Sequence, residues 1–317
     1  NRINSIYLNS QSFNTLSLLF MKNILSKLSY LLLVALFISC GSKEQKETGW
    51  TSLLDKDLSK WDMYLSYEMK DNYNGSVPLD ANGDTIKPIG YNNNYKNVFT
   101  VIQDGDEPIL KVSGEVYGCV FTKESYRNYH LRLKMKWGNQ KWEPRLNKSL
   151  DSGILYHSIG ECGADYWRTW MTSHEFQLIE TGTEGSSGDY WCIGQTQMDV
   201  RARKDSSRVV FDSAASLIPI GVNSPNGYYC AAKGTTEKPK EEWNDIELIC
   251  YEGKSLHIVN GNVVMALSNL RHLDNGETKP LVEGKIQLQS EAGEVFYKDI
   301  EIKKIEELPA EYQQYFN

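Results

Sequence analysis

The sequence lacks the features that mark several common classes of protein. Its six cysteines include no CxxC spacing, which argues against a zinc site. Its lysines and arginines are scattered, no basic helix is visible and the formal net charge is −7, so no nucleic acid partner is expected. There is no internal repeat, no Pro/Gly/Ser-rich linker, no phosphate-binding loop and no Ser-His-Asp set. These absences indicate a single acidic domain. Any contact of this domain with a membrane is expected to come from an anchor.

Long apolar runs are absent except near the start of the chain. Residues 31–38 (LLLVALFI) are apolar and lead into Ser39-Cys40-Gly41. Such a run is too short for a stable membrane span and is typical of a secretory signal. The small residue before Cys40 predicts a bacterial lipoprotein in which Cys40 carries the lipid; an ordinary signal peptide with an incidental cysteine is the alternative. The expected parts are a leader with upstream residues (1–40), a tether (41–49) and one domain (50–317), held by the lipid at the periplasmic or outer-membrane face of the bacterial cell envelope.

The cysteines that follow Cys40 are odd in number, so at least one must be free. Cys162 and Cys192 flank the central loops and are candidates for a disulfide in an oxidising compartment. Buried free thiols are the equally weighted alternative.

Helical periodicity is almost absent, and short strand-like runs take its place from Trp50 onward. Residues 130–136 (HLRLKMK) alternate polar and apolar side chains without interruption. Asn260-Gly261 between two apolar runs predicts a type I′ hairpin. Residues 70–97 are rich in Asn, Gly and Asp and predict a long loop, whereas residues 309–316 predict one short helix. Many short strands at close spacing predict an all-β sandwich or barrel.

The stretch from residue 151 to residue 191 has the composition of a ligand site. Residues 174–180 (HEFQLIE) alternate, so Glu175 and Gln177 point to one side of a strand and Phe176 to the other. The preceding strand-like run, SGILYH, ends on His157. An apolar face below and an acid-plus-amide face above predict a sheet that carries a polar ligand.

An ordered set of short motifs runs across residues 50–305. The motifs are Trp137-Gly138, Lys141-Trp142-x-Pro144-Arg145, Asp151 to His157, Trp170-Met171, Glu175-Phe176-Gln177, Gly188-Asp189-Tyr190-Trp191, Glu242-Trp243-Asn244, His257-x-Val259-Asn260-Gly261, Gly284-x-Ile286-x-Leu288-Gln289 and Phe296 to Ile300. Together they resemble the 3-keto-disaccharide hydrolase family. The resemblance implies a jelly-roll β-sandwich of two antiparallel sheets, similar to concanavalin and laminarinase domains, that cleaves glycosides already oxidised to a ketone at C3. The chain departs from the family pattern in the long link 181–187 and at Glu291, near which relatives often carry histidine.

The implied chemistry gives these residues roles. A C3 ketone acidifies the C2 proton, so the reaction needs a base, an acid for the leaving group and positive charge near the enolate oxygen. A divalent metal ion could act as the Lewis acid, with His157 and Glu175 as its ligands, or Arg145 or Arg168 could supply the charge. Glu175 and His157 are also the candidate bases. Gln177 on the face of Glu175 is expected to hydrogen-bond sugar hydroxyls.

Other candidates carry two interpretations each. Glu180 faces the core in a regular strand, so either a bulge brings it into the site as a catalytic group or it is solvated. Asp189 either binds a cation or caps a loop, and the tryptophans either stack on sugar rings or lie in the core. His174 is expected to be structural because it lies on the face of Phe176. The predicted substrate contacts are Gln177, Arg145, Arg168, Trp142, Trp170, Asp189, Trp191, His257 and Gln289.

Two other functions compete with this one. Glu175-x-Gln177-x-x-Glu180 is similar to the ExDxxE strand of laminarinase-like enzymes, and a bulge would place the two glutamates roughly 5 Å apart for a retaining glycosidase. The fold also hosts sugar-binding modules without catalytic activity. Oligosaccharides or glycosides are the expected partners in every case.

Overall fold

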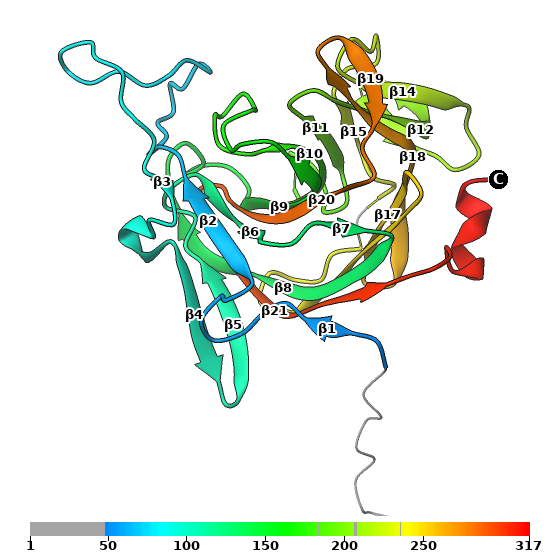
Figure 1. The fold of residues 1–317 in the computed structure, drawn as a ribbon, viewed down its shortest axis with the longest axis horizontal. Helices are drawn as coiled ribbons and strands as arrows, with labels where there is room; N and C mark the ends of the chain where they lie inside the picture. The colour runs from blue at the N-terminus through cyan, green and yellow to red at the C-terminus, as the bar shows by residue number, and fades with distance from the viewer. Residues whose placement is uncertain (1–47, 183, 206–207, 235) are drawn as a thin grey trace, which may run out of the picture. The chain divides into compact units, whose positions relative to one another are not determined.

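The computed structural model describes residues 48–182, 184–205, 208–234 and 236–317. Cys40, the predicted leader and most of the predicted tether lie outside these residues. Residues 49–317 form one compact unit, whose strands are labelled in Figure 1. None of the helices in the described ranges has the length and apolar character needed to span a bilayer.

Two antiparallel sheets make up the domain, as the sequence predicts. The first has the order β13-β12-β18-β17-β16-β8-β21-β5-β4, with β1 on β21, β14 on β12 and β19 on β18. Its strands are β1 (Thr51–Ser52), β4 (Phe99–Asp104), β5 (Glu107–Val112), β8 (Tyr129–Lys141), β12 (Thr196–Asp205), β13 (Arg208–Phe211), β14 (Leu217–Gly221), β16 (Asn244–Tyr251), β17 (Lys254–Val259), β18 (Asn262–Asp274), β19 (Glu277–Pro280) and β21 (Gly293–Lys304).

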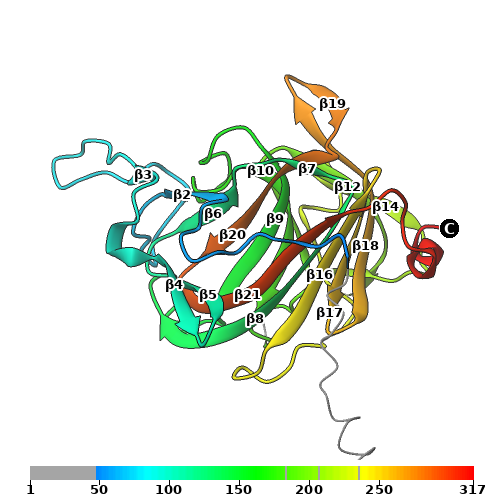
Figure 2. The same cartoon turned by 60° about the horizontal axis from the view of Figure 1, so that its bottom comes forward.

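The second sheet carries the candidate site. Its order is β15-β11-β10-β9-β20-β6-β2-β3, with β7 on β20. Figure 1 shows β9 and β20 lying over β8 and β21 of the first sheet, and Figure 2 shows β8, β21 and β16 side by side. Its strands are β2 (Trp61–Leu65), β3 (Gly90–Tyr91), β6 (Gly118–Thr122), β7 (Tyr126–Arg127), β9 (Asp151–Ile159), β10 (Thr172–Ile179), β11 (Tyr190–Ile193), β15 (Tyr229–Cys230) and β20 (Glu283–Ser290).

Alternation along the strands builds the core between the sheets. In β8, Leu131, Leu133 and Met135 are buried, while the residues between them are half-buried. From the second sheet, Phe176 and Leu178 of β10 join the same core cluster. Burial of such side chains supplies the main driving force for folding, at about 25 cal/mol per Å² of apolar surface. The prediction of an all-β sandwich is confirmed.

The predicted connections are present with small differences. Asn260 and Gly261 join β17 to β18 with φ angles of 49° and 76°, the left-handed conformation that a type I′ turn requires. Within the long loop 70–97, the structure adds the short strand β3 and the 3₁₀ helix η1 (Tyr95–Asn97), and the short C-terminal helix is the 3₁₀ helix η2 (Ala310–Tyr315). The five cysteines of the described residues, Cys162 and Cys192 included, are free thiols.

Candidate active site

A cavity on the second sheet has a volume of about 710 Å³, and we call it the carboxyl pocket. Its floor comes from β9, β10 and the residue that follows β20. Glu175 and Gln177 point into it because they alternate with Phe176 and Leu178, which face the core. The pocket therefore lies on the face of β10 predicted from the sequence. Its lining residues are Arg145, Asp151, Ala164, Asp165, Tyr166, Trp167, Trp170, Glu175, Gln177, Trp191, Cys192, Ile193, Gly194, Gln195, Tyr228 and Glu291.

Strand register brings three carboxyl groups to this floor. Gln177 pairs with Gly153 and Glu175 with Leu155 across β10 and β9. Gly153 leaves the space that Glu175 occupies, since a Cβ atom there would lie 2.6 Å from Glu175 Oε1. Asp151 starts β9, Glu291 follows β20, and both line the pocket. Asp151, Glu175 and Glu291 are named the carboxyl cluster below.

Asp151 is the anchored member of the carboxyl cluster. Its Oδ2 lies 2.9 Å from Arg145 Nη2, and its Oδ1 accepts a hydrogen bond of 2.8 Å from Gln177 Nε2. Arg145 also reaches Glu184 at 3.2 Å. Both oxygens of Asp151 are thus engaged, whereas the carboxyl groups of Glu175 and Glu291 are left to face a ligand.

Burial changes the proton affinity of the whole cluster. It raises the pKa of Asp151 to about 7, against the opposing effect of the Arg145 charge. Burial, reinforced by the Asp151 charge, raises the pKa of Glu175 well above its usual range, while the Gln289 amide opposes the rise. Burial and the charges of Asp151 and Glu175 likewise raise the pKa of Glu291, which Arg145 in part offsets. Burial therefore favours the protonated forms of Glu175 and Glu291, and the charge of each member of the cluster affects the proton affinity of the others.

Two of the predicted tryptophans line the pocket and one does not. Trp170 is buried and donates its indole N–H to Gly118 O at 3.1 Å, whereas Trp191 is 40% exposed at the mouth. Trp142 donates to Ser113 O at 3.0 Å and is not among the lining residues.

His157 does not share the pocket with Glu175, and this part of the sequence interpretation is wrong. Its φ of 51° and the shift of the β9–β20 register break the alternation of β9. The imidazole is buried beside Tyr129 and Tyr156, with Nδ1 3.0 Å from Leu281 O. The predicted metal-ligand pair of His157 and Glu175 is not formed. Within the described ranges, no group of three or more His, Cys, Asp or Glu side chains is placed to hold a metal ion.

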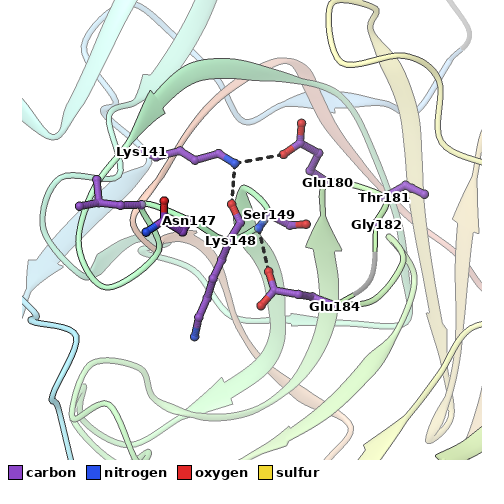
Figure 3. A pocket seen from close by; sticks show the side chains of 9 residues that line it. Lys141, Asn147, Lys148, Ser149, Glu180, Thr181, Gly182 and Glu184 are labelled. Carbon is purple, nitrogen blue, oxygen red and sulfur yellow. Dashed lines mark hydrogen bonds and ion pairs between the residues drawn. The ribbon is translucent and has the colours of Figure 1, made fainter.

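Glu180 lies in a different cavity, drawn in Figure 3, with a volume of about 580 Å³. It follows the end of β10, accepts the Leu150 N–H at 3.2 Å and lies 3.6 Å from Lys141 Nζ. In the same cavity, Glu184 accepts the Ser149 N–H at 2.7 Å. The bulge that would bring Glu180 to Glu175 does not occur, so the pair proposed for a retaining glycosidase is not assembled.

Asp189 caps a loop, one of the two interpretations open from the sequence. Its oxygens accept the Ala232 N–H at 2.7 Å, the Ser186 N–H at 3.2 Å and the Tyr229 hydroxyl. With both oxygens occupied, Asp189 is not a ligand of the pocket.

Three further predicted contacts fall at or beyond the edge of the pocket. His257 is buried in the core, where its ring stacks on Phe176 with centroids 4.2 Å apart. Arg168 donates to Gly75 O at 3.1 Å, away from the pocket lining. Gln289 is fully buried beside Glu175, and its amide atoms make no hydrogen bond of good geometry in the part of the chain that is described.

Asp151 and Glu291 are the site residues that sequence reasoning missed. Asp151 begins one of the family motifs. It lies two residues before Gly153, so strand alternation places the two residues on the same face of β9. Glu291 continues the alternation of Gln287 and Gln289, which would have placed it beside the pocket. Their approach to Glu175 depends on pairing between strands far apart in the chain.

Comparisons with known proteins give the chain its family. No curated protein matches the chain. Two proteins of Parabacteroides distasonis described as candidate glycosyl hydrolases match its structure: one at 16% identity and TM-score 0.43, covering 81% of this chain and 99% of the other, and one at 18% and 0.42, covering 84% and 98%. LamA of Zobellia galactanivorans, solved with laminaritriose and laminaritetraose, matches at 12% and 0.41, covering 78% and 93%. Likeness at this level identifies no activity.

The family model is more informative because it matches most of the chain. The model of the 3-keto-alpha-glucoside-1,2-lyase-like domain covers residues 49–303. That range includes both sheets, the carboxyl cluster and Arg145. The chain belongs to the 3-keto-alpha-glucoside-1,2-lyase-like domain family.

Proposed function

We propose that this protein cleaves glycosides whose sugar carries a ketone at C3, by removal of the C2 proton, elimination of the C1 substituent and addition of water. The main observation in support is the carboxyl pocket, in which the buried carboxyl groups of Glu175 and Glu291 line one cavity together with Arg145, in a chain of the 3-keto-alpha-glucoside-1,2-lyase-like family. Elimination needs a proton acceptor and a proton donor close together, and two carboxyl groups in different surroundings are a common solution.

Glu291 is the better candidate for the base. The Arg145 charge opposes the rise of its pKa, whereas no positive charge offsets the rise for Glu175, so Glu291 gives up its proton more readily than Glu175. Glu175 is the better candidate for the acid, because burial and the Asp151 charge keep it protonated. This assignment changes the role expected for Glu175 from the sequence, where it was a base or a metal ligand.

Arg145, Asp151 and Gln177 would bind and orient the sugar. The ion pair of 2.9 Å fixes the guanidinium at the floor, where its positive charge can face the enolate oxygen that develops at C3. Gln177 is held by Asp151 and keeps its carbonyl oxygen for a sugar hydroxyl. Charge stabilisation of this kind is strong in a site from which water is largely excluded.

The steps balance without an external oxidant or reductant. Glu291 takes the C2 proton, the electrons of that bond form the C1–C2 double bond, and the C1–oxygen bond breaks. The leaving oxygen takes the proton of Glu175. Water then adds its hydroxyl to C1 and a proton to C2, which gives the free 3-keto sugar and completes a net hydrolysis.

An assay with paired substrates tests the proposal. Release of the aglycone from an aryl 3-keto-glucoside, but not from the same aryl glucoside without the ketone, is the expected result. A 3-keto substrate deuterated at C2 should react more slowly, because the C2–H bond breaks in the proposed step. Release from the plain glucoside would instead establish an ordinary glycosidase, and release from neither would leave a sugar-binding module.

We also propose that the protein is anchored at the bacterial cell envelope through a lipid on Cys40. The support is the apolar run and small residue that precede Cys40 in the sequence. Mass spectrometry of the membrane fraction should find acyl chains on Cys40, and Cys40→Ser should release the protein from that fraction. Equal membrane retention of Cys40→Ser would refute the anchor.

A further inference from the structure

Aromatic side chains gather at the mouth of the carboxyl pocket and remain partly open to solvent. Tyr166 is 58% exposed, Tyr228 50% and Trp191 40%, and all three line the cavity. Trp167 lies beside them and stacks on Tyr73 with ring centroids 5.1 Å apart. Large apolar surfaces left open around a cavity mark a place where a ligand binds.

Polarity changes sharply from the floor of this pocket to its mouth. The floor holds the charged and amide groups that the proposed reaction uses. At the mouth, the carboxylate of Asp165 is already occupied by the N–H groups of Trp167, Thr169 and Trp170. Apart from the tyrosine hydroxyls and the indole N–H groups, Gln195 is the one other polar side chain with a free hydrogen-bonding group among the described mouth residues. The exposed or half-buried residues of the mouth, besides Asp165, are Ala164, Tyr166, Trp167, Trp191, Gly194, Gln195 and Tyr228.

This gradient distinguishes between two kinds of leaving group. A second sugar would bring several hydroxyls to the mouth, where few side chains can replace their hydrogen bonds to water. A planar aromatic ring needs no such partners and gains from stacking against tyrosine and tryptophan. We infer that the preferred substrates carry an aromatic aglycone, a phenolic glycoside whose sugar lies on the floor and whose ring lies at the mouth. This inference rests on the proposed function and names the substrate class of the same site.

The chemistry of such a substrate fits the proposed elimination. The phenolic oxygen leaves with the electrons of the C1–oxygen bond and takes the proton of Glu175, so a neutral phenol is released. The sugar product is the same as for any other aglycone. The aromatic side chains of the mouth therefore determine which aglycone is preferred and do not change the reaction.

Binding of unoxidised ligands tests the inference separately from catalysis. Tryptophan fluorescence would follow titrations of the full chain with phenyl glucoside, methyl glucoside and a glucose disaccharide, in both anomeric forms. We expect phenyl glucoside to bind about tenfold more tightly than methyl glucoside, and the disaccharide to bind no more tightly than methyl glucoside. A disaccharide that binds more tightly than phenyl glucoside, or a phenyl group that adds no affinity, would overturn the inference.

Variants of the mouth locate the effect. Tyr228→Ala and Trp191→Ala should each weaken phenyl glucoside binding about fivefold and methyl glucoside binding much less. Tyr95→Ala removes an exposed tyrosine far along the chain in η1 and serves as the control with unchanged affinity. Equal losses for both ligands would contradict the aromatic subsite. If phenyl glucoside binds selectively but the 3-keto glycosides are not cleaved, the proposed function is refuted and the aromatic subsite stands. If the 3-keto glycosides are cleaved but the disaccharide binds more tightly than phenyl glucoside, the preference for an aromatic aglycone is refuted and the proposed function stands.

Discussion

Two clusters of buried ionisable side chains can be compared, one on the outer face of the second sheet and one in the core between the two sheets. The carboxyl cluster faces outward into the pocket. The histidine cluster, His157, His174 and His257, surrounds the Tyr156 ring in the core, with centroid distances of 5.4, 5.6 and 5.7 Å. Burial raises the pKa values of the acids and lowers those of the imidazoles, so both clusters favour the neutral state.

The difference between the clusters lies in how their polar atoms are used. His257 has partners on both sides, Gly188 O at 3.0 Å and the Tyr156 hydroxyl at 3.1 Å. His174 and His157 each bond through Nδ1 alone, to the Tyr190 hydroxyl at 2.7 Å and to Leu281 O at 3.0 Å, and their Nε2 atoms are buried among the described residues without a partner and away from the carboxyl pocket. Glu175 and Glu291 instead present their carboxyl groups to a cavity. Both clusters are buried, but the histidines pack in the core, whereas the carboxyl groups are available to react with a ligand.

The largest expected effect is the loss of activity in Glu175→Gln. Without the proton donor, turnover of a 3-keto glycoside should fall about 10³-fold, in the range typical of general acid catalysis. The fall should be smaller for aryl aglycones, which leave more easily without a proton. Steady-state kinetics with both substrate types measures this, and Glu180→Gln in the second cavity is the matched control. Full activity of Glu175→Gln would remove Glu175 from the mechanism.

For His257→Ala we expect a loss of stability with little loss of activity, in contrast to Glu175→Gln. Loss of the ring that stacks on Phe176 and of two hydrogen bonds should cost about 3 kcal/mol in the free energy of unfolding. Thermal melts should show a decrease in Tm of roughly 6 to 12 °C, with activity per folded molecule retained. His272→Ala on β18 provides a half-buried histidine for comparison. A loss of activity without a loss of stability would contradict the structural role assigned to the histidine cluster.

Gly153→Ala should affect the carboxyl cluster while the core stays intact. The added Cβ would lie 2.4 Å from Gln289 Oε1 and 2.6 Å from Glu175 Oε1, so the side chains of both residues would have to move. A displacement near 1 Å at a reacting group lowers turnover by about 10². Turnover and Tm should be measured together, with Gly182→Ala at the second cavity as control. Unchanged turnover would show that the position of Glu175 is not critical.

The contributions of the two clusters to the free energy of unfolding should change with pH in opposite directions. The folded pKa of Glu175 is raised, so its contribution to stability is present below the unfolded pKa near 4.5 and is lost as pH rises through the folded pKa. Glu175→Gln should therefore be more stable than the wild type at pH 8 and similar to it at pH 4. Chemical denaturation at both pH values measures the difference, and a destabilised variant at pH 8 would contradict it.

The histidines should give the reverse dependence. Burial lowers the pKa of His157 to about 4 and that of His257 to about 3, so the folded state resists their protonation. Stability should decrease as pH falls from the unfolded value near 6.5 through these pKa values. His157→Phe should flatten this decrease in denaturant titrations between pH 7 and pH 4. An unchanged slope would mean that the pKa of His157 is the same in the folded and unfolded states, which would contradict the prediction.

Much of the fold was predictable because it depends on local pattern. Uninterrupted alternation in residues 130–136 and 174–180 placed two strands and their buried faces correctly. Asn260-Gly261 gave its hairpin because few other residue pairs favour two left-handed φ angles. The same alternation placed Glu175 and Gln177 on the pocket side and His174 on the core side.

The site was less predictable, since it depends on irregular backbone and on distant pairing. A local bulge turned His157 inward, and nothing in SGILYH signals it. The position of Arg145 against Asp151 follows from a loop that the strand pattern does not describe.

The sequence alone determined which faces of the strands are apolar, because side chains alternate with a fixed period of two. It also determined the family, through an ordered set of motifs that the family model matches over residues 49–303. Only the tertiary structure decided which polar groups meet, since β20 and β9 join Glu291 to Glu175 across more than a hundred residues of chain. Pairing of distant strands sets that proximity, and pairing is a property of the whole sheet.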